Sequence, residues 1–224
     1  PVQLQEMRSQ VVGAKLGQDA VRTSLMAGVI GLILVFAFMI IYYRIPGLAA
    51  SIALVMYTAF VIVLLSAFNE EITLTLPGIA GIILGIGMAV DANCIIFARI
   101  REEIGAGKSV RTAIDAGFAK AFSAIIDGNV TTLIAAGVLY FIGSGTVKGF
   151  AQTLALGIVV SMFTALVITK NILKSFYAVG LQDEKLYGKT VYTKTFNFIG
   201  KRKLFYSASG IVIAIGIVAM VVSG

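Results

Sequence analysis

Six long apolar stretches dominate this sequence of 224 residues. Each is long enough to cross a lipid bilayer as a helix, which takes about 20 residues. The second is the clearest, because no charged residue occurs between Arg44 and Glu70. The stretches are continuously apolar, whereas the strands of a membrane β-barrel alternate apolar and polar residues. We therefore expect six spanning helices, at residues 25–43, 47–68, 77–98, 121–142, 150–172 and 204–222.

The composition excludes a water-soluble fold. Hydrophobic residues make up 58% of the chain and charged residues only 13%, against about 25% in an ordinary soluble domain. A folded chain of this size leaves much of its surface facing solvent and cannot hide so many apolar side chains. A disordered chain has few apolar and many charged residues, which is the opposite balance. The sequence therefore predicts an all-α polytopic membrane protein.

The missing residue types limit the possible chemistry. The chain has no His and a single Cys, Cys94. This excludes Ser–His and Cys–His nucleophilic pairs, His-based zinc sites and internal disulfides. We therefore expect no metal site, no cofactor and no catalytic residue. Carboxylates, hydroxyls and amides remain as the functional groups.

The basic residues indicate how the chain crosses the membrane. The net charge is +7, and all but four of the 18 Lys and Arg residues lie on one side of the expected spans. The four exceptions are Arg8, Lys15, Arg22 and Lys148. Loops rich in Lys and Arg stay on the cytoplasmic side, so both ends of the chain are expected to face outward. The positive charge thus indicates topology, and no nucleic-acid partner is expected.

The spans and their connections suggest four parts. Residues 1–24 read as the end of an external domain, and we expect the chain to be an internal piece of a larger protein. Residues 25–175 form a transmembrane domain of five helices. Its cytoplasmic segment 99–120 is expected to hold an interfacial helix, capped by Ser109, with the apolar stripe Val110, Ile114, Phe118 and Phe122. A cytoplasmic linker, 176–203, and a last helix, 204–224, follow.

The third span carries a pattern of small residues. Gly81, Gly85 and Ala89 recur every four residues, which lets a neighbouring helix approach closely. Gly87 lies one turn before Asp91 on the same face, and it leaves open space beside that carboxylate. All four of these small residues are expected to serve helix packing.

Asp91 is the candidate functional residue. A carboxylate inside a bilayer costs about 2.5–3.5 kcal/mol on insertion scales, and low-dielectric surroundings disfavour the charged form of any carboxyl group. We therefore expect Asp91 to bind and release a proton. The alternative is a static hydrogen bond or ion pair between helices. Because no Lys, Arg or His lies at comparable depth, a cationic partner would have to come from outside these spans.

Three further polar residues are candidates for supporting roles. Asn93 lies two residues after Asp91 and therefore on a different face of the helix. Asp127 and Thr131 share one face of the fourth span, and Asn129 and Thr132 share another. Asp127 is near the cytoplasmic end, where a solvated carboxylate is as reasonable as a functional one. Together, polar residues of the third and fourth spans are expected to line a shared path.

Several runs of the sequence resemble the SecD family of protein-export membrane proteins. They lie at residues 16–19, 42–47, 85–93, 99–103, 107–111, 127–134 and 149–154. Residues 196–203 resemble the start of SecF. The resemblance covers about residues 10–175, and it departs from the usual family pattern at Cys94, Ala98 and Gly128. It implies an internal fragment of a fused SecDF with the transmembrane fold of the RND superfamily.

The resemblance also implies a function. The family works beside the SecYEG channel in the bacterial cytoplasmic membrane and uses the proton gradient to help move exported polypeptides outward. Asp91 matches the position of the family's proton-carrying Asp. The implied partners are the SecYEG translocon, the remaining SecF half, the exported polypeptide and the lipid bilayer.

Three other hypotheses were weighed. The first is a proton-coupled RND exporter of lipids or small molecules. The second is an intramembrane aspartyl protease that uses Asp91 and Asp127, but Val90 and Ile126 precede these residues where that family requires Tyr and Gly. The third is a structural scaffold. The sequence favours a proton-driven translocation subunit that is not an enzyme.

Overall fold

The computed structural model describes residues 14–68, 72, 75–188, 200 and 202–223. The chain divides into two units, residues 1–190 and 191–224. All of the secondary structure in the described residues is helical, which confirms the predicted fold class.

Helices α1 (Ala14–Tyr43) and α2 (Ile45–Ala67) form a tight hairpin. A single residue, Arg44, joins them, and its φ of 58° lies in the left-handed region. Pro46 occupies the first turn of α2, where a missing N–H is tolerated. Gly47 has to be glycine because a Cβ there would collide with the Met39 carbonyl oxygen. The sharp turn at residues 43–47 therefore depends on these backbone requirements.

Helices α3 (Leu76–Gly105) and α4 (Val110–Ile142) are longer than predicted. The Thr75 Oγ1 caps α3 by accepting a hydrogen bond from Gly78 N at 3.1 Å. Ser109 caps α4 as predicted, accepting from Thr112 N at 3.4 Å. Only residues 106–109 connect the two helices. The expected helix capped by Ser109 is therefore present, but it forms the first part of α4 and continues into the fourth span, while residues 99–105 extend α3.

The apolar stripe at the start of α4 explains this difference. Val110, Ile114 and Phe118 are buried in the core at this end of the bundle, whereas Phe122 is 53% exposed. Gly117 lets α4 lie directly against α3, because a Cβ there would approach the Ile100 side chain to 2.5 Å. The stripe thus faces protein, and α4 continues unbroken into the fourth span.

The fifth span is a composite of three helical segments. These are α5 (Thr146–Phe163), a five-residue π-helical turn η1 (Thr164–Ile168) and α6 (Thr169–Ala178). Threonine hydroxyls add hydrogen bonds to backbone carbonyl groups at both ends of this turn. Thr164 Oγ1 donates to Val160 O at 2.5 Å, and Thr169 Oγ1 donates to Thr164 O at 3.2 Å. The span therefore continues past the expected end at residue 172.

Five helical segments in the described part of the chain are long and apolar enough to cross a membrane. They start at Asp19, Ile45, Leu76, Val110 and Thr146 and correspond to the first five predicted spans. The sixth prediction, 204–222, falls on α8 (Arg202–Ser223) in the second unit. Its apolar part, Phe205–Met220, is shorter than the other spans, so five of the six expected spans are found among the described residues.

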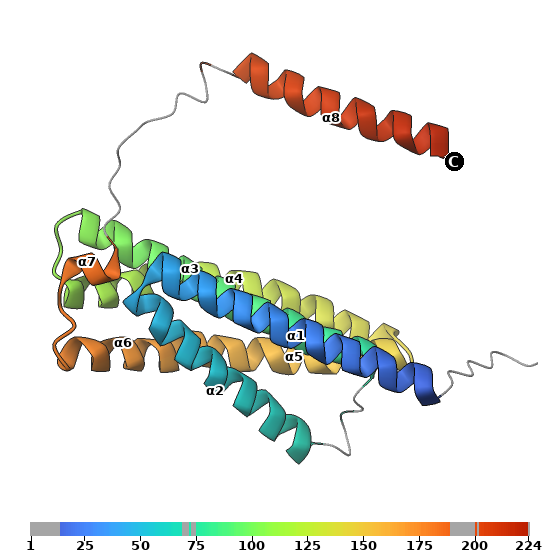
Figure 1. The fold of residues 1–224 in the computed structure, drawn as a ribbon, viewed down its shortest axis with the longest axis horizontal. Coiled ribbons are helices and arrows are strands. Elements are labelled where there is room, and N and C mark those ends of the chain that lie inside the picture. The colour runs from blue at the N-terminus through green and yellow to red at the C-terminus, as the bar shows by residue number, and fades with distance from the viewer. Residues whose placement is uncertain (1–13, 69–71, 73–74, 189–199, 201, 224) are drawn as a thin grey trace, which may run out of the picture. The chain divides into compact units, whose positions relative to one another are not determined.

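Helix α3 occupies the centre of the first unit and contacts α1, α2, α4 and α5 (Figure 1). One face of α3 packs against α5 and α2 through the small residues Gly81, Gly85 and Ala89, all of which are buried. A Cβ at Gly81 would lie 2.7 Å from Thr153 Oγ1, and a Cβ at Gly85 would collide with the Tyr57 hydroxyl. In a bilayer, where lipid is as apolar as the core, such close backbone contact is a main source of helix association.

The short helix α7 (Glu184–Tyr187) contacts α2 and Arg101 of α3. Tyr187 is fully buried, and its hydroxyl donates to Leu181 O at 2.9 Å. This burial raises the pKa of Tyr187 to about 12. The Arg101 guanidinium lies 4.8 and 4.7 Å from the ring centroids of Tyr42 and Tyr43, and it also donates to the Tyr187 carbonyl at 3.4 Å.

Candidate functional site

Asp91 lies midway along α3, fifteen residues after Leu76 and fourteen before Gly105. Each end of the helix is therefore about 21 Å away along the axis. The side chain is exposed on a face of α3 that the described residues do not cover. Within the described residues, no hydrogen bond or ion pair forms at its carboxylate. The acid thus lies in the middle of α3 and faces away from the packed core.

A cavity of about 160 Å³ lies beside this carboxylate, between α3 and α4. Such a volume is enough for several water molecules. The lining combines one acid, one amide and one hydroxyl with apolar side chains. The residues are Met88, Asp91, Ala92 and Ile95 from α3, and Ala124, Ile125, Gly128, Asn129 and Thr132 from α4.

Two glycines keep the surroundings of Asp91 open. A Cβ added to Gly87 or Gly128 would meet no atom within 4 Å. Gly87 lies one turn before Asp91 on the same face, as expected, but the packing role predicted for it is wrong because no other helix lies against it among the described residues. Gly128 lines the cavity from the opposite helix. The carboxylate is therefore accessible to water or to a further helix.

The polar groups of α4 that accompany Asp91 are Asn129 and Thr132. The Asn129 amide donates to Ile125 O at 2.7 Å, and the Thr132 hydroxyl donates to Gly128 O at 3.1 Å. Both bonds are to their own helix, which fixes the rotamers. Both side chains keep an oxygen that can accept a hydrogen bond from water.

The predicted supporting residues lie elsewhere. Asn93 is buried on another face of α3, where its amide donates to Ala89 O at 3.0 Å and its Oδ1 has no partner among the described residues. Asp127 and Thr131 are exposed and do not line the cavity, and the Thr131 hydroxyl donates to Asp127 O at 2.8 Å. The structure thus groups Asp91 with the other polar face of α4.

The spacing of small and polar residues in the sequence indicates which face of α4 packs against a neighbouring helix. Ala124, Gly128 and Thr132 recur every four residues, and Ile125 and Asn129 follow the same spacing one position later. Small and polar residues at this spacing mark a helix face that approaches another helix. The sequence does not show that this face packs against α3, and this contact is what places it beside Asp91.

Outside this site, the buried residue Glu103 uses both of its carboxylate oxygens in ion pairs. Glu103 is 4% exposed, and its two carboxylate oxygens each lie 2.5 Å from the ammonium of a lysine, Lys108 or Lys120. These contacts join the end of α3 to the start of α4. Over the described ranges, no cluster of three or more His, Cys, Asp or Glu side chains is arranged to hold a metal ion.

Comparison with known proteins relates residues 1–179 to the family described as protein export membrane protein SecD/SecF, C-terminal. A protein translocase subunit SecD from Acidaminococcus fermentans is 54% identical over 173 residues, which cover 77% of this chain and 41% of that protein. A SecD subunit from Synechocystis is 53% identical over 174 residues, covering 77% of this chain and 36% of the relative. The chain therefore spans well under half of the length of these relatives.

Two solved structures have a similar fold. The crystal structure of SecDF, a translocon-associated membrane protein from Thermus, matches with a TM-score of 0.82 and 38% identity, over 91% of this chain and 28% of that chain. A structure of SecDF in a super-membrane-facing form matches with a TM-score of 0.75 and 38% identity, over 89% of this chain and 27% of the other.

Proposed function

Because this chain belongs to the SecD/SecF family of protein export membrane proteins, we propose that it forms the membrane-embedded part of a Sec translocase accessory component. In this proposal the protein uses the proton motive force to promote the export of polypeptides across the bacterial cytoplasmic membrane. Its partners are the SecYEG translocon, a SecF half and the exported polypeptide. The fold is of the RND type, and the protein is not an enzyme.

The observation that supports the proton-driven role is the position of Asp91. Its carboxylate lies at the midpoint of a spanning helix, beside a cavity large enough for water, and without a cation among the described residues. The protonated acid is neutral and compatible with the bilayer interior, whereas the ionised acid requires water or a positive partner. Each protonation step therefore changes what can lie against this face of α3.

The neighbouring groups fit the same role. Asn129 and Thr132 offer hydrogen-bonding oxygens to a water file that reaches the carboxylate, and Gly87 and Gly128 leave room for it. A proton that crosses the membrane through such a path releases about 2.3 kcal/mol per 100 mV of membrane potential. This energy is available to move one packed unit against another.

Helix α3 is built to transmit such a change. Another face of α3 packs closely against α5 and α2 through Gly81 and Gly85, so α3 cannot shift without moving these neighbours. In this proposal, a force on α3 that follows a change in the charge of Asp91 moves α3 together with α5 and α2. The most direct consequence is that a protein segment packed against the exposed face of Asp91 changes its position when Asp91 gains or loses a proton.

The test is the substitution Asp91→Asn in the intact protein, with export measured in membrane vesicles in the presence of the proton gradient and after its collapse. Asn has nearly the same shape but cannot carry the proton. We expect the gradient-dependent part of export to be lost and the remainder to persist. The matched control is Asp127→Asn, an exposed acid of α4 that does not line the cavity. Undiminished gradient-dependent export by the Asp91 variant would refute the proposal.

The protease alternative requires two carboxylates that share one catalytic water. Asp91 lines the cavity but Asp127 does not, so the described structure does not assemble that pair. For the export of lipids or small molecules, no feature of the site provides specific support. Protein export therefore stands as the single proposed function.

A further inference from the structure

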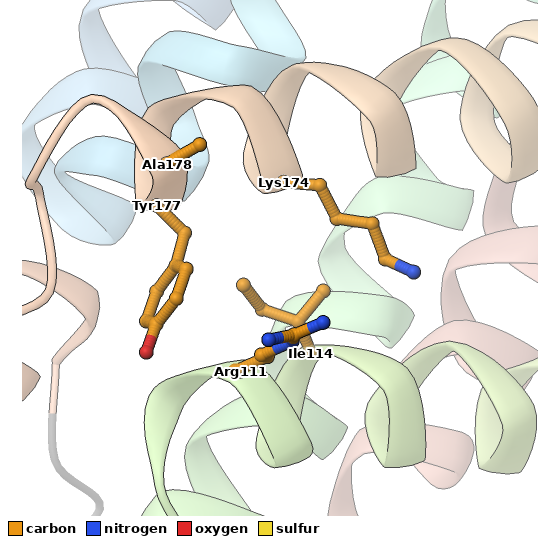
Figure 2. Close-up of a pocket in the computed structure, with 5 residues that line it drawn as sticks. All are labelled: Arg111, Ile114, Lys174, Tyr177 and Ala178. Atoms are coloured by element: carbon orange, nitrogen blue, oxygen red, sulfur yellow. The ribbon is translucent and has the colours of Figure 1, made fainter.

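A second cavity, of about 320 Å³, lies between α4 and α6 at the end of the bundle that carries most of the basic residues. Figure 2 shows Lys174, Tyr177 and Ala178 of α6 facing Arg111 and Ile114 of α4 across this space. We propose that this cavity binds the phosphate headgroup of an anionic phospholipid, whose acyl chain lies in the adjoining groove. The site is separate from Asp91 and goes beyond the export function.

The charges around the cavity favour an anion. Within the described residues, Arg111 makes no hydrogen bond or ion pair. Lys174 and Lys170 share one carboxylate, that of Asp115, at 2.8 and 3.6 Å. Three cations thus face a single acid. A guanidinium without a partner is well suited to a phosphate, because its planar donors match two phosphate oxygens at once.

The adjoining cavity has the opposite character. It measures about 510 Å³ and lies between the same helical segments, further from the helix ends. The lining is apolar except for one lysine at its edge. The residues are Phe118, Ala119 and Phe122 from α4, Leu166 and Val167 from η1, and Lys170 from α6.

The two cavities match the two parts of a phospholipid. The basic cavity at the helix ends would take the headgroup, and the apolar cavity next to it would take the acyl chain. Helix α4 begins near Arg111 and α6 ends at Ala178, so both helices lead from the first cavity towards the second. The eleven residues from Arg111 to Phe122 correspond to about 16 Å of helix rise, a length that accommodates a glycerol and much of an acyl chain. Lys170 lies at the junction with its ammonium 5.6 Å from the Phe118 ring centroid. Its stem covers apolar surface while its charge remains with the headgroup.

The depth of the site agrees with this occupant. Arg111 is the second residue of α4, and Ala178 is the last residue of α6, so the first cavity lies at the ends of both helices, outside the apolar part of each expected span. The distribution of Lys and Arg assigns this end to the cytoplasmic side. Basic cavities between spanning helices on that side are suited to anionic headgroups.

The experiment is native mass spectrometry of the intact, delipidated protein with phosphatidylglycerol added at increasing concentrations. Phosphatidylcholine, with the same acyl chains and no net charge, serves as the comparison lipid. We expect phosphatidylglycerol to bind in preference to phosphatidylcholine. Arg111→Gln should weaken binding about fivefold, and the double variant with Lys174→Gln about thirtyfold, since each cation near the surface contributes a similar increment. The matched control is Lys148→Gln, because Lys148 stacks on Tyr140 at the opposite end of the spans.

A further variant and a competing anion separate a lipid from a free phosphate. Phe122→Gln changes the apolar groove without touching the cations, and we expect it to weaken phosphatidylglycerol binding. Added inorganic phosphate should displace the lipid only weakly, because it cannot use the groove. Size-exclusion profiles identical to the unsubstituted protein establish folding, and Arg111→Lys, which keeps the charge, should retain most of the binding.

Three results would overturn the assignment. The first is equal binding of phosphatidylglycerol and phosphatidylcholine. The second is phosphatidylglycerol binding that Arg111→Gln, Arg111→Lys and Lys148→Gln leave equally unchanged. The third is complete displacement of the lipid by inorganic phosphate with no effect of Phe122→Gln, which would indicate a site for a soluble anion.

Discussion

The close packing of α3 against α5 and α2 predicts different stability effects for alanine substitutions at two glycines of α3. Gly85 faces the fully buried Tyr57 and lies close to Gly157, and a methyl group added there would collide with the Tyr57 hydroxyl. Gly87, two residues on, has nothing within 4 Å of the same added atom. Replacing each glycine by alanine therefore makes the same chemical change in a closed and in an open environment.

The magnitude follows from two opposing contributions. Alanine stabilises a helix interior by about 1 kcal/mol relative to glycine, and this gain is the same at both positions. Overpacking a tightly packed site costs about 1–3 kcal/mol, and this cost applies at Gly85 alone. We therefore expect Gly87→Ala to be neutral or stabilising, and Gly85→Ala to be about 1–3 kcal/mol less stable than Gly87→Ala.

A second substitution isolates the atom responsible. Tyr57→Phe removes the hydroxyl that the new methyl group would meet, and this hydroxyl has no hydrogen-bond partner within the described ranges. The change by itself breaks no hydrogen bond seen in the structure. In the double variant with Gly85→Ala, we expect the destabilisation to fall by about 1 kcal/mol or more, which is the coupling expected of residues in direct contact.

The assay is reversible unfolding of the intact protein in mixed detergent micelles, followed by circular dichroism as the denaturing detergent increases. Each variant gives a free energy of unfolding, and the four proteins of the Gly85–Tyr57 cycle give the coupling energy. Equal stabilities of Gly85→Ala and Gly87→Ala would refute the packing argument. So would a coupling energy of zero, because the collision would then involve an atom other than the Tyr57 hydroxyl.

Two further predictions concern the ends of the bundle. Arg101→Gln removes the cation that stacks on Tyr42 and Tyr43 and donates to Tyr187 O, so amide hydrogen exchange in α7 should become about 5- to 30-fold faster. Arg99→Gln is the control, and unchanged exchange in α7 would contradict the anchoring role of Arg101. Thr75→Ala removes the cap of α3 and should lower the free energy of unfolding by about 1 kcal/mol, whereas Thr75→Ser should retain it. Equal stabilities of the two variants would show that this cap does not contribute.

The predictions from sequence that agree with the structure rest on local physical chemistry. The first five spans were recognised because a bilayer sets the length and polarity of a spanning helix. The Ser109 cap was recognised because it depends on residues close by in the chain. The placement of Asn93 on a different face from Asp91 follows from helix geometry alone, and the structure has it so.

Two features that the sequence left open depend on contacts beyond the near neighbours in the chain. The stripe of Val110, Ile114 and Phe118 is compatible with a lipid surface or with a protein neighbour, and only the packing of α3 and α6 beside it decides between them. The π-helical turn at Thr164 was also not foreseen, because a displaced hydrogen-bond ladder leaves little trace in hydropathy.

The sequence by itself determined that this protein is a helical membrane protein, where most of its spans lie and which carboxylate is the exceptional one. These properties follow from the cost of placing each residue in a bilayer, which depends on the residue and its near neighbours. Only the tertiary structure decided that Asn129 and Thr132, rather than Asp127 and Thr131, accompany Asp91. The physical reason is that both faces of α4 are polar at this level, and the one that meets Asp91 is selected by how α3 and α4 pack.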